Sequence, residues 1–212
     1  MIEVRSVSYR YPKTEEYVLR SLDLTFDRGG VWALTGPNGC GKTTLTKLMT
    51  GVLRPETGTI TIDGADERDM SLFDIGQHVG YVFQNPAKQL FCATVAEEIA
   101  FGLRNQGLGK DAVEETVAAY LDRFHLTCHR DDYPGKLSQG EKQRVVLAAV
   151  LAMGTDYLIL YEPTTGLDIR GRHELGEMLR SLVRERETGV LLVSHERDFI
   201  ARYADGETEM GR

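Results

Sequence analysis

Residues 36–43 have the types and spacing of a loop that binds phosphate groups. They match the complete pattern G-x-x-x-x-G-K-[ST], follow the apolar run Val31–Thr35 and open a plausible helix, which is the context that the pattern requires. The glycines let successive backbone N–H groups point at phosphate oxygens, and the helix adds its positive dipole end. Lys42 is expected to reach the β- and γ-phosphates, and Thr43 to offer a hydroxyl to Mg²⁺. We therefore predict a nucleoside triphosphate site formed by Gly36, Pro37, Asn38, Gly39, Cys40, Gly41, Lys42, Thr43 and Thr44.

A second group of residues, at the end of an apolar strand, would complete this chemistry. Residues 158–160 are Leu-Ile-Leu, and Tyr161 and Glu162 follow them. P-loop hydrolases usually place an aspartate that helps to hold Mg²⁺ where this chain has Tyr161. Because a phenol is a poorer ligand for a hard cation than a carboxylate, we expect weak Mg²⁺ binding and slow hydrolysis. Glu162 is the candidate to orient or deprotonate the attacking water, unless it is only a surface charge at the strand end.

A third motif points to a family. Residues 137–144 read Leu-Ser-Gln-Gly-Glu-Lys-Gln-Arg and resemble the signature motif, usually written LSGGQ, of the ABC (ATP-binding cassette) ATPases. Ser138 and Gly140 stand at their usual places, whereas Gln139 replaces a glycine and Glu141 replaces the glutamine. Ser138 and the N–H groups that open the next helix suit a γ-phosphate, although serine is also a common N-cap. The resemblance implies an α/β fold, with the P-loop NTPase core of an ABC-type ATPase.

Other family landmarks occur in the expected order. By this resemblance Gln84 senses the metal and the water, Asp168 meets a second subunit, and His195 is the switch histidine that contacts the γ-phosphate. Tyr11 is expected to stack on adenine, with its neighbour Tyr9 as the competing candidate. The resemblance therefore implies catalytic roles for Glu162, His195 and Gln84, ATP contacts from Tyr11, Ser138, Gly140 and Asp168, and Mg²⁺ ligation by Thr43 and Gln84.

The segment from Phe83 to Val95 is similar to the energy-coupling-factor branch of the family, which includes the cobalt and nickel importer ATPases. The resemblance implies a motor subunit that hydrolyses ATP to drive uptake of a vitamin or a transition-metal ion. Its implied partners are a second ABC ATPase subunit, joined head to tail, and integral membrane subunits at the cytoplasmic face of the membrane. Alternatively, Leu90 and Phe91 only anchor the helices that follow. Relatives usually add a final strand pair and a dimer-stabilising tail, which we expect to be absent here.

Two other functions stay open. Tyr161 favours a regulatory or degenerate nucleotide-binding subunit without useful hydrolysis. A soluble ABC-type ATPase that acts on DNA or ribosomes is the other alternative. It is disfavoured because 25 Lys and Arg face 32 Asp and Glu, a net charge of −7, and because no sustained heptads separate the phosphate loop from the signature. We therefore expect no nucleic-acid partner.

Alternating strands and helices must position these residues. Apolar and β-branched runs predict strands at 2–9, 22–26, 31–35, 58–63, 80–84, 157–161 and 189–194. Apolar spacing predicts helices at 42–50, 95–103, 113–126, 140–153 and 170–186. The first two strands suggest an antiparallel addition, and the alternation after residue 31 favours a parallel sheet. We expect a single domain over residues 1–212, with a helical insertion at about 85–150.

The composition is that of a chain with a real core. It is 42% hydrophobic, and no apolar run approaches the length of about 18 residues that a membrane span needs. No secretory signal is visible at the start of the sequence. The three cysteines are far apart and have no metal-ligand spacing, so we expect a reducing, cytosolic compartment.

Overall fold

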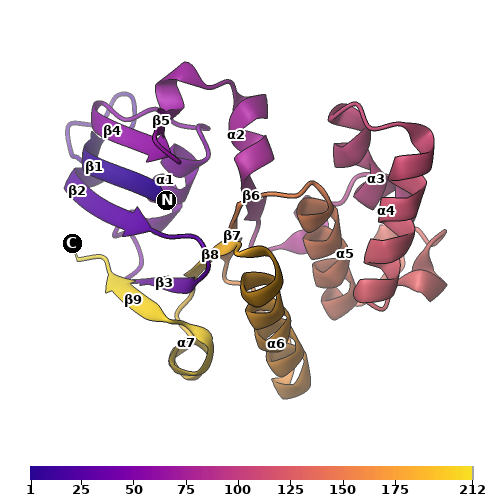
Figure 1. Cartoon of the computed structure of the whole chain (residues 1–212). Coiled ribbons are helices and arrows are strands. Elements are labelled where there is room, and N and C mark those ends of the chain that lie inside the picture. Colours follow the sequence, from indigo (N-terminus) through magenta and orange to yellow (C-terminus); the bar gives the residue numbers. More distant parts are fainter. Residues whose placement is uncertain (212) are drawn as a thin grey trace.

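Two β-sheets of different topology build the nucleotide-facing part of the computed structural model, which describes residues 1–211. The antiparallel sheet has the order β2-β1-β4-β5, with β1 Ile2–Tyr9, β2 Leu19–Phe26, β4 Thr57–Ile62 and β5 Ala65–Asp66. The second sheet is parallel, with the order β6-β7-β8-β3-β9. Its strands are β6 Val79–Val82, β7 Tyr157–Tyr161, β8 Gly189–Val193, β3 Val31–Thr35 and β9 Gly206–Glu209. Figure 1 shows the strands of both sheets beside α1.

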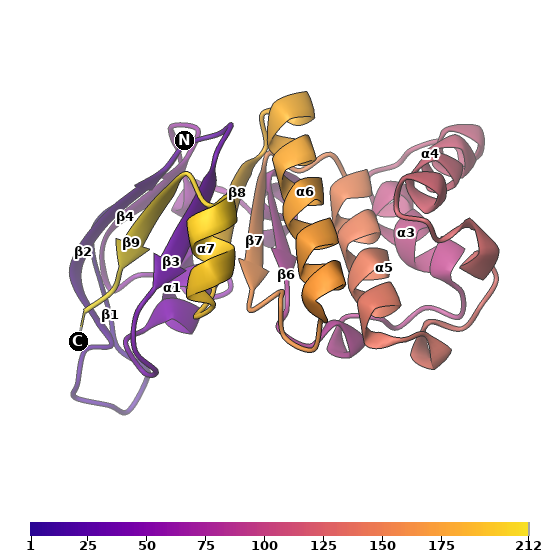
Figure 2. The ribbon, with the colours of Figure 1, turned by 90° about the horizontal axis from the view of Figure 1, so that it is seen from below.

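Helices cover the parallel sheet and extend away from it. They are α1 Lys42–Met49, α2 Leu72–His78, α3 Val95–Asn105, α4 Lys110–Arg123, α5 Gln139–Ala152, α6 Ile169–Arg186 and α7 Arg197–Tyr203. Between β6 and β7 the chain forms α3, α4, α5 and short 3₁₀ turns, with no strand among these described residues. Figure 2 shows the antiparallel sheet at one end of the molecule, α3 and α4 at the other, and the parallel sheet between them. No helix within residues 1–211 combines the length and the apolar character that a membrane span requires.

Alternation along the parallel strands divides the core into two clusters, because successive side chains of a strand point to opposite faces. Leu158 and Leu160 of β7 pack with the helices α3 to α7. Ile159 of the same strand packs instead against Leu45 and Leu48 of α1 and the apolar face of the antiparallel sheet. Helix α1 therefore lies between the two sheets, and the turn that precedes it is held from both sides.

Most of the expected elements are confirmed, and several features differ, among them α7 and the two-residue β5, which were not expected. The strand expected at 58–63 does not extend the parallel sheet, because β4 pairs antiparallel with β1. A final strand is present: β9 pairs parallel with β3 through main-chain bonds, although its sequence, Gly-Glu-Thr-Glu, has no apolar alternation. Helix α2 was not expected, since Leu72 and Phe73 are exposed and only Ile75 is buried on it. The expectation of one domain stays a prediction.

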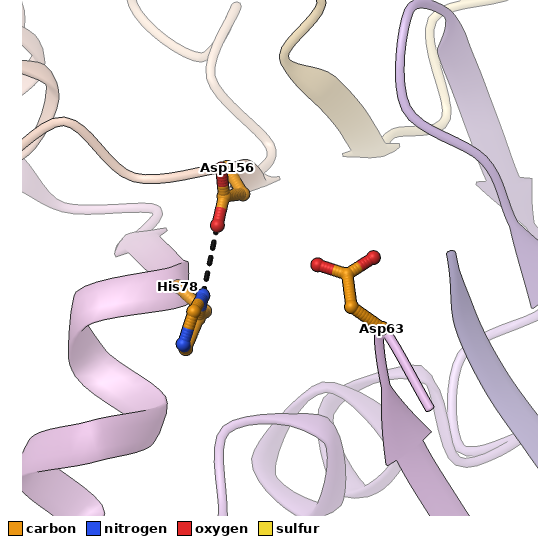
Figure 3. Close-up of side chains that lie close together, drawn as sticks. All are labelled: Asp63, His78 and Asp156. Atoms are coloured by element: carbon orange, nitrogen blue, oxygen red, sulfur yellow. Dashed lines mark hydrogen bonds and ion pairs between the residues drawn. The ribbon is translucent and has the colours of Figure 1, made fainter. Parts of the chain in front are cut away.

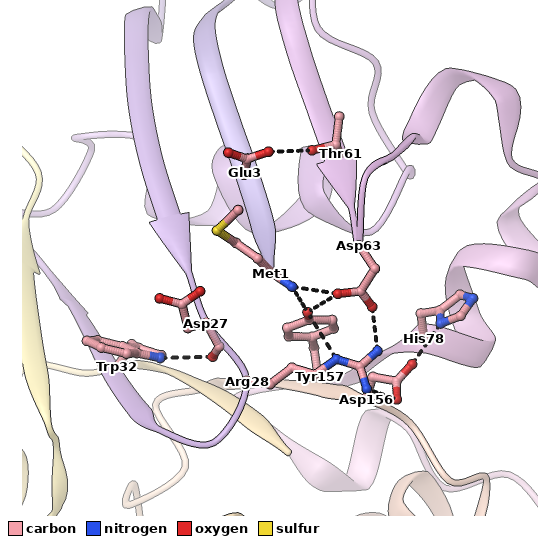
Figure 4. A network of polar contacts seen from close by, with 10 residues as sticks. All are labelled: Met1, Glu3, Asp27, Arg28, Trp32, Thr61, Asp63, His78, Asp156 and Tyr157. Atoms are coloured by element: carbon pink, nitrogen blue, oxygen red, sulfur yellow. Dashed lines mark hydrogen bonds and ion pairs between the residues drawn. The ribbon is translucent and has the colours of Figure 1, made fainter. Parts of the chain in front are cut away.

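A polar network joins the two sheets at the end remote from the phosphate loop. Asp63, His78 and Asp156 offer ligand atoms within 4.8 Å of one another, the spacing of a metal site (Figure 3). The Arg28 guanidinium, however, forms ion pairs with both carboxylates, at 2.7 Å to Asp156, and Tyr157 donates its hydroxyl to Asp63 at 2.6 Å (Figure 4). A cation already neutralises this cluster, so we assign it to structure.

The packing of α6 on α7 gives a first prediction. A Cβ atom at Gly176 would lie 2.3 Å from the Cζ atom of Tyr203, which is buried. Gly176→Ala is therefore expected to lower the free energy of unfolding by about 1–3 kcal/mol, as overpacking does. The matched control is Gly76→Ala in α2, where a Cβ meets nothing within 4 Å. It should raise the free energy of unfolding by about 0.5–1 kcal/mol. Denaturant unfolding measures both, and equal effects would contradict the packing argument.

The polar network gives a second prediction. Burial alone would raise the pKa of Asp63, but hydrogen bonds from Arg28 and Tyr157 outweigh it and hold that pKa well below its usual range. A lowered pKa contributes stability that is present above the unfolded value of about 3.9 and is lost as the pH falls towards the folded value. Asp63→Asn should be less stable than wild type at pH 6 and should lose less stability on acidification. Denaturation curves between about pH 6 and pH 3 test this. The control, Asp122→Asn on the exposed face of α4, should keep the wild-type slope.

Candidate functional site

The predicted phosphate loop, residues 36–43, connects β3 to α1. Its glycines adopt positive φ angles, 137° at Gly36, 84° at Gly39 and 102° at Gly41. Two of them are also confined by neighbours. A Cβ at Gly36 would lie 2.5 Å from the carbonyl oxygen of Met210, and one at Gly41 would lie 2.6 Å from Leu19 Cδ2. The loop therefore requires glycine both for its backbone conformation and for its close packing.

Lys42 is folded back into this loop. Its side chain is buried, and Nζ donates to the carbonyl oxygens of Gly36 at 2.7 Å and Pro37 at 3.1 Å. Cys40 is buried beside it, with Sγ 3.9 Å from Nζ. The ammonium group is thus held inside the loop by carbonyl dipoles, at the place where phosphate oxygens are expected.

Tyr161 is in direct contact with the loop's threonine. Its hydroxyl lies 2.7 Å from Thr43 Oγ1, and either atom is able to donate. Both residues line one open cavity of about 510 Å³ together with Gln84, Tyr81, Lys47 and Lys88. The predicted metal ligands Thr43 and Gln84 therefore line one cavity, and Tyr161 lines it with them.

The donor set in this cavity does not fit a magnesium ion. Mg²⁺ is usually held by one or two carboxylates together with phosphate oxygens and water. Among the described residues that line the cavity there is no Asp or Glu, while two lysines line it. The Thr43 hydroxyl is also already engaged by Tyr161. The predicted ligands are thus close together, but the protein offers the cation only neutral oxygens.

Glu162 and His195 form the second predicted pair. Glu162 takes the left-handed φ of 47°, and its N–H donates to the Val193 carbonyl at 2.7 Å. This turn directs the carboxylate to His195, with Oε1 3.5 Å from Nε2, and Ser194 donates to Oε2 at 3.5 Å. A largely buried carboxylate beside a half-exposed imidazole has the parts of a general base and a neighbouring hydrogen-bond donor.

Tyr11 lies at the side of the loop. Its hydroxyl is 3.1 Å from Thr44 Oγ1, and its ring packs edge-on against Tyr9 with 5.2 Å between centroids. Tyr9 is buried in the core, whereas Tyr11 is partly exposed, so Tyr11 is the better placed of the two to meet a ligand. Its contact with adenine stays a prediction.

Ser138, Gly140 and Asp168 form a separate group at the starts of α5 and α6. Figure 2 shows these two helices on the other side of β7 from α1. Ser138 caps α5 in a reciprocal box, in which its hydroxyl donates to Glu141 Oε2 at 2.7 Å and accepts from the Glu141 N–H at 3.3 Å. The Ser138 backbone N–H also donates to Glu141 Oε2, at 2.8 Å, and the two bonds from Ser138 to this carboxylate lower the pKa of Glu141. Asp168 caps α6 by accepting from the Gly171 N–H at 2.7 Å. None of these three residues lines the cavity that holds Thr43 and Tyr161.

Two polar side chains that the sequence analysis did not single out hold the segment between Tyr81 and Cys92. Gln89 accepts from the Phe83 N–H at 3.1 Å and donates to the Tyr81 carbonyl at 2.8 Å, so it braces the turn that carries Gln84. Gln84 itself is exposed, two residues beyond the end of β6. The buried Glu98 accepts from the N–H groups of Phe91 and Cys92, each at 2.5 Å.

Burial raises the pKa of Glu98, and burial together with Glu98 raises the pKa of the Cys92 thiol to about 11. Cys92 is therefore a poor nucleophile at neutral pH, because the thiolate is the reactive form. The sequence does not indicate that Glu98 is buried and binds the loop, because acidic residues are common in the first turn of a helix.

Comparisons with known proteins identify the family of this chain. The family model described as ABC transporter matches residues 19–165. A putative ABC transporter ATP-binding protein of Pyrococcus abyssi is 44% identical over 205 residues, covering 97% of this chain and 78% of that protein. The energy-coupling factor transporter ATP-binding protein EcfA of Methanothermobacter thermautotrophicus is 42% identical over 207 residues, covering 97% of this chain and 66% of that protein.

A solved structure gives the same result at the level of the fold. The structure of cbiO1 from Clostridium perfringens, described as part of the ABC transporter complex cbiONQ, superposes with a TM-score of 0.90. It is 33% identical in sequence, and the match covers 99% of this chain and 84% of that one. Family model, relatives and fold agree, and the chain belongs to the ABC transporter family.

Proposed function

We propose that this chain is an ATP-binding subunit of an importer of the energy-coupling-factor type, and that it hydrolyses ATP slowly at its own phosphate loop. The observation that carries the second part is the contact between Tyr161 and Thr43, where a carboxylate would otherwise support the metal. The names of the relatives, which include EcfA proteins, support the first part. The imported solute on this proposal is a vitamin or a transition-metal ion.

In this proposal ATP enters a loop that is already formed. Gly36, Gly39 and Gly41 hold the backbone in its turn, and the start of α1 provides free N–H groups for the phosphates. Lys42 exchanges the carbonyl oxygens of Gly36 and Pro37 for phosphate oxygens, which are stronger acceptors for a charged donor. Tyr11, which is partly exposed beside Thr44, packs on the base.

Glu162 and His195 carry the chemical step on this proposal. Glu162 takes the proton of the attacking water, and His195 contacts the γ-phosphate from the neighbouring turn. Both are positioned by the backbone after β7 and β8 and not by Tyr161. Hydrolysis is therefore slow because the negative charge on the phosphates is poorly stabilised, whereas the general base Glu162 keeps its position.

The separate group of Ser138, Gly140 and Asp168 serves a second ABC ATPase subunit. Ser138 and Gly140 open α5, where the helix N-terminus favours an anionic phosphate. A Cβ at Gly166 would lie 3.4 Å from Gln139 Cγ, so the turn before Asp168 packs on the start of α5. The three residues thus lie on one continuous surface. In a head-to-tail dimer this surface would cover the ATP bound by the partner subunit.

Membrane subunits are proposed to dock at the aromatic pair Phe91 and Phe101. The two rings pack edge to face with 4.9 Å between centroids, and they are 67% and 46% exposed. They border a hollow of about 110 Å³ lined by Leu90, Val150 and Met153. Exposed aromatic side chains next to an apolar hollow are typical anchors for a protein partner. The subunit then sits at the cytoplasmic face of the membrane as a peripheral protein.

A second candidate function is a regulatory subunit that binds nucleotide without useful hydrolysis. The Tyr161 hydroxyl on Thr43 favours it directly. In a mixed dimer such a subunit would still complete its partner's site with Ser138 and Gly140. A role on DNA or ribosomes has no comparable support, because the named relatives are transporter proteins.

ATP turnover tests the slow-site proposal. The purified chain should hydrolyse ATP slowly in Mg²⁺, and Tyr161→Asp should raise the rate by at least about tenfold, since removing support from a metal site costs about 10–100-fold. Adding Glu162→Gln to Tyr161→Asp should remove the gain. A wild-type rate equal to that of Tyr161→Asp would contradict the proposal, and a silent Tyr161→Asp variant that binds ATP would favour the regulatory function.

Association with membrane subunits tests the docking surface. Phe91→Ser together with Phe101→Ser should reduce co-purification with the membrane subunits in detergent by at least about tenfold, since anchor residues contribute about 2 kcal/mol or more. ATP binding should be unchanged in the same protein. Leu108→Ser, which removes an exposed apolar side chain from the loop between α3 and α4, is the matched control. If Leu108→Ser reduces co-purification as much as the double variant does, the proposed docking surface at Phe91 and Phe101 is wrong.

A further inference from the structure

We propose that this chain binds ATP without Mg²⁺, and that the Tyr161–Thr43 hydroxyl pair contacts the phosphates where related sites place the metal. The inference rests on the proposed function in one respect, that the phosphate loop binds ATP. It departs from what the family resemblance implies, because the resemblance makes Mg²⁺ a cofactor.

The first argument is a count of hydroxyl hydrogens. Thr43 and Tyr161 each carry one, and their oxygens are 2.7 Å apart. One hydrogen is used in the bond between them, whichever atom donates. The other hydrogen then points away from the pair and needs an acceptor. A phosphate oxygen is such an acceptor, so the pair offers the nucleotide one O–H donor.

The second argument is the charge of the cavity. Among the described residues that line it, Lys47 and Lys88 are the ionisable side chains apart from tyrosines, and there is no carboxylate. Lys47 follows Thr43 by four residues on α1, which puts both on one face of the helix. A doubly charged cation in this cavity meets like charge, whereas the phosphates of metal-free ATP meet compensating charge.

The third argument concerns the one carboxylate at the strand end. Glu162 follows Tyr161 directly, but its φ of 47° turns it towards the other side, where His195 and Ser194 contact it. It does not line the cavity that holds Thr43, Tyr161 and Gln84. Gln84 would contribute one neutral amide oxygen from an exposed turn, far less than Mg²⁺ receives in its usual sites.

Because Mg²⁺ binding and ATP binding are thermodynamically linked, these arguments predict the direction in which Mg²⁺ changes the affinity for ATP. Mg²⁺ binds free ATP in solution. A protein that offers the metal no ligand therefore does not bind the Mg²⁺–ATP complex more tightly than ATP alone. If metal-free ATP is the species that fits, added Mg²⁺ withdraws it from solution. The apparent affinity for ATP should then be unchanged or tighter when the metal is chelated, the reverse of what a metal-supported site shows.

The experiment is calorimetric titration of the full chain with ATP, in excess Mg²⁺ and in EDTA at equal ionic strength. Wild type should bind as tightly in EDTA as in Mg²⁺, or more tightly. Tyr161→Asp, which supplies the carboxylate, should bind at least about tenfold more tightly in Mg²⁺ than in EDTA. Wild-type binding that disappears in EDTA would overturn the inference and leave the proposed function intact. No binding in either buffer would instead overturn the proposed ATP site.

Two further variants test the hydroxyl itself. Tyr161→Phe keeps the ring and removes the hydroxyl, and it should weaken ATP binding in EDTA several-fold, as the loss of a hydrogen bond to a charged group does. Tyr133→Phe is the control, because it removes an exposed phenol that does not line this cavity. It should bind ATP as wild type does. Equal affinities for wild type and Tyr161→Phe in EDTA would overturn the proposed contact.

Discussion

The position of helix α1 between the two sheets is the constraint on which the rest of the site depends. Leu45, Leu48 and Met49 are fully buried, and they pack together with β1 and β4 on one side and β7 and β8 on the other. The loop before α1 is therefore fixed at both ends, by β3 within the parallel sheet and by the buried helix. A phosphate-binding turn needs this rigidity, since its N–H groups act together only when their directions are set in advance.

Within this fixed frame the chemistry depends on a few side chains at strand ends. Tyr161 ends β7, and the turns after β7 and β8 carry Glu162 and His195. Because neighbouring parallel strands end at one edge of the sheet, residues distant in the sequence meet there. A change at one strand end alters the metal environment without moving the base. On the proposed function, a complete phosphate loop and a poor metal site therefore occur in the same chain.

Much of the site was predictable because its pattern is local. The phosphate loop and the strand and helix around it follow from apolar runs and glycine spacing, and the Tyr161 departure is visible at a fixed place after Leu160. The pairing of β4 with β1 was not predictable, because alternation shows which face is buried and not which strand is its neighbour. Strand β9 escaped notice because it is held by main-chain bonds to β3, for which a polar sequence gives no signal.

The roles of Gln89 and Glu98 were missed for a similar reason. Each binds main-chain groups of a loop six to eight residues away, Gln89 at Tyr81 and Phe83, and Glu98 at Phe91 and Cys92. Such contacts depend on how a loop is folded, which residue type and periodicity do not encode. The candidate site residues come from local motifs, whereas the side chains that hold the loop beneath them have no such signal.

The left-handed turn at Glu162 has a consequence for how this site changes over time. Because that turn is fixed by its own φ of 47° and by the bond to Val193, the residue before it is free to vary without disturbing the base. Tyrosine and aspartate codons differ at a single nucleotide. On the proposed function, the difference between a metal-poor and a metal-supporting site is therefore one point mutation, and a lineage is able to cross it in either direction without rebuilding the fold.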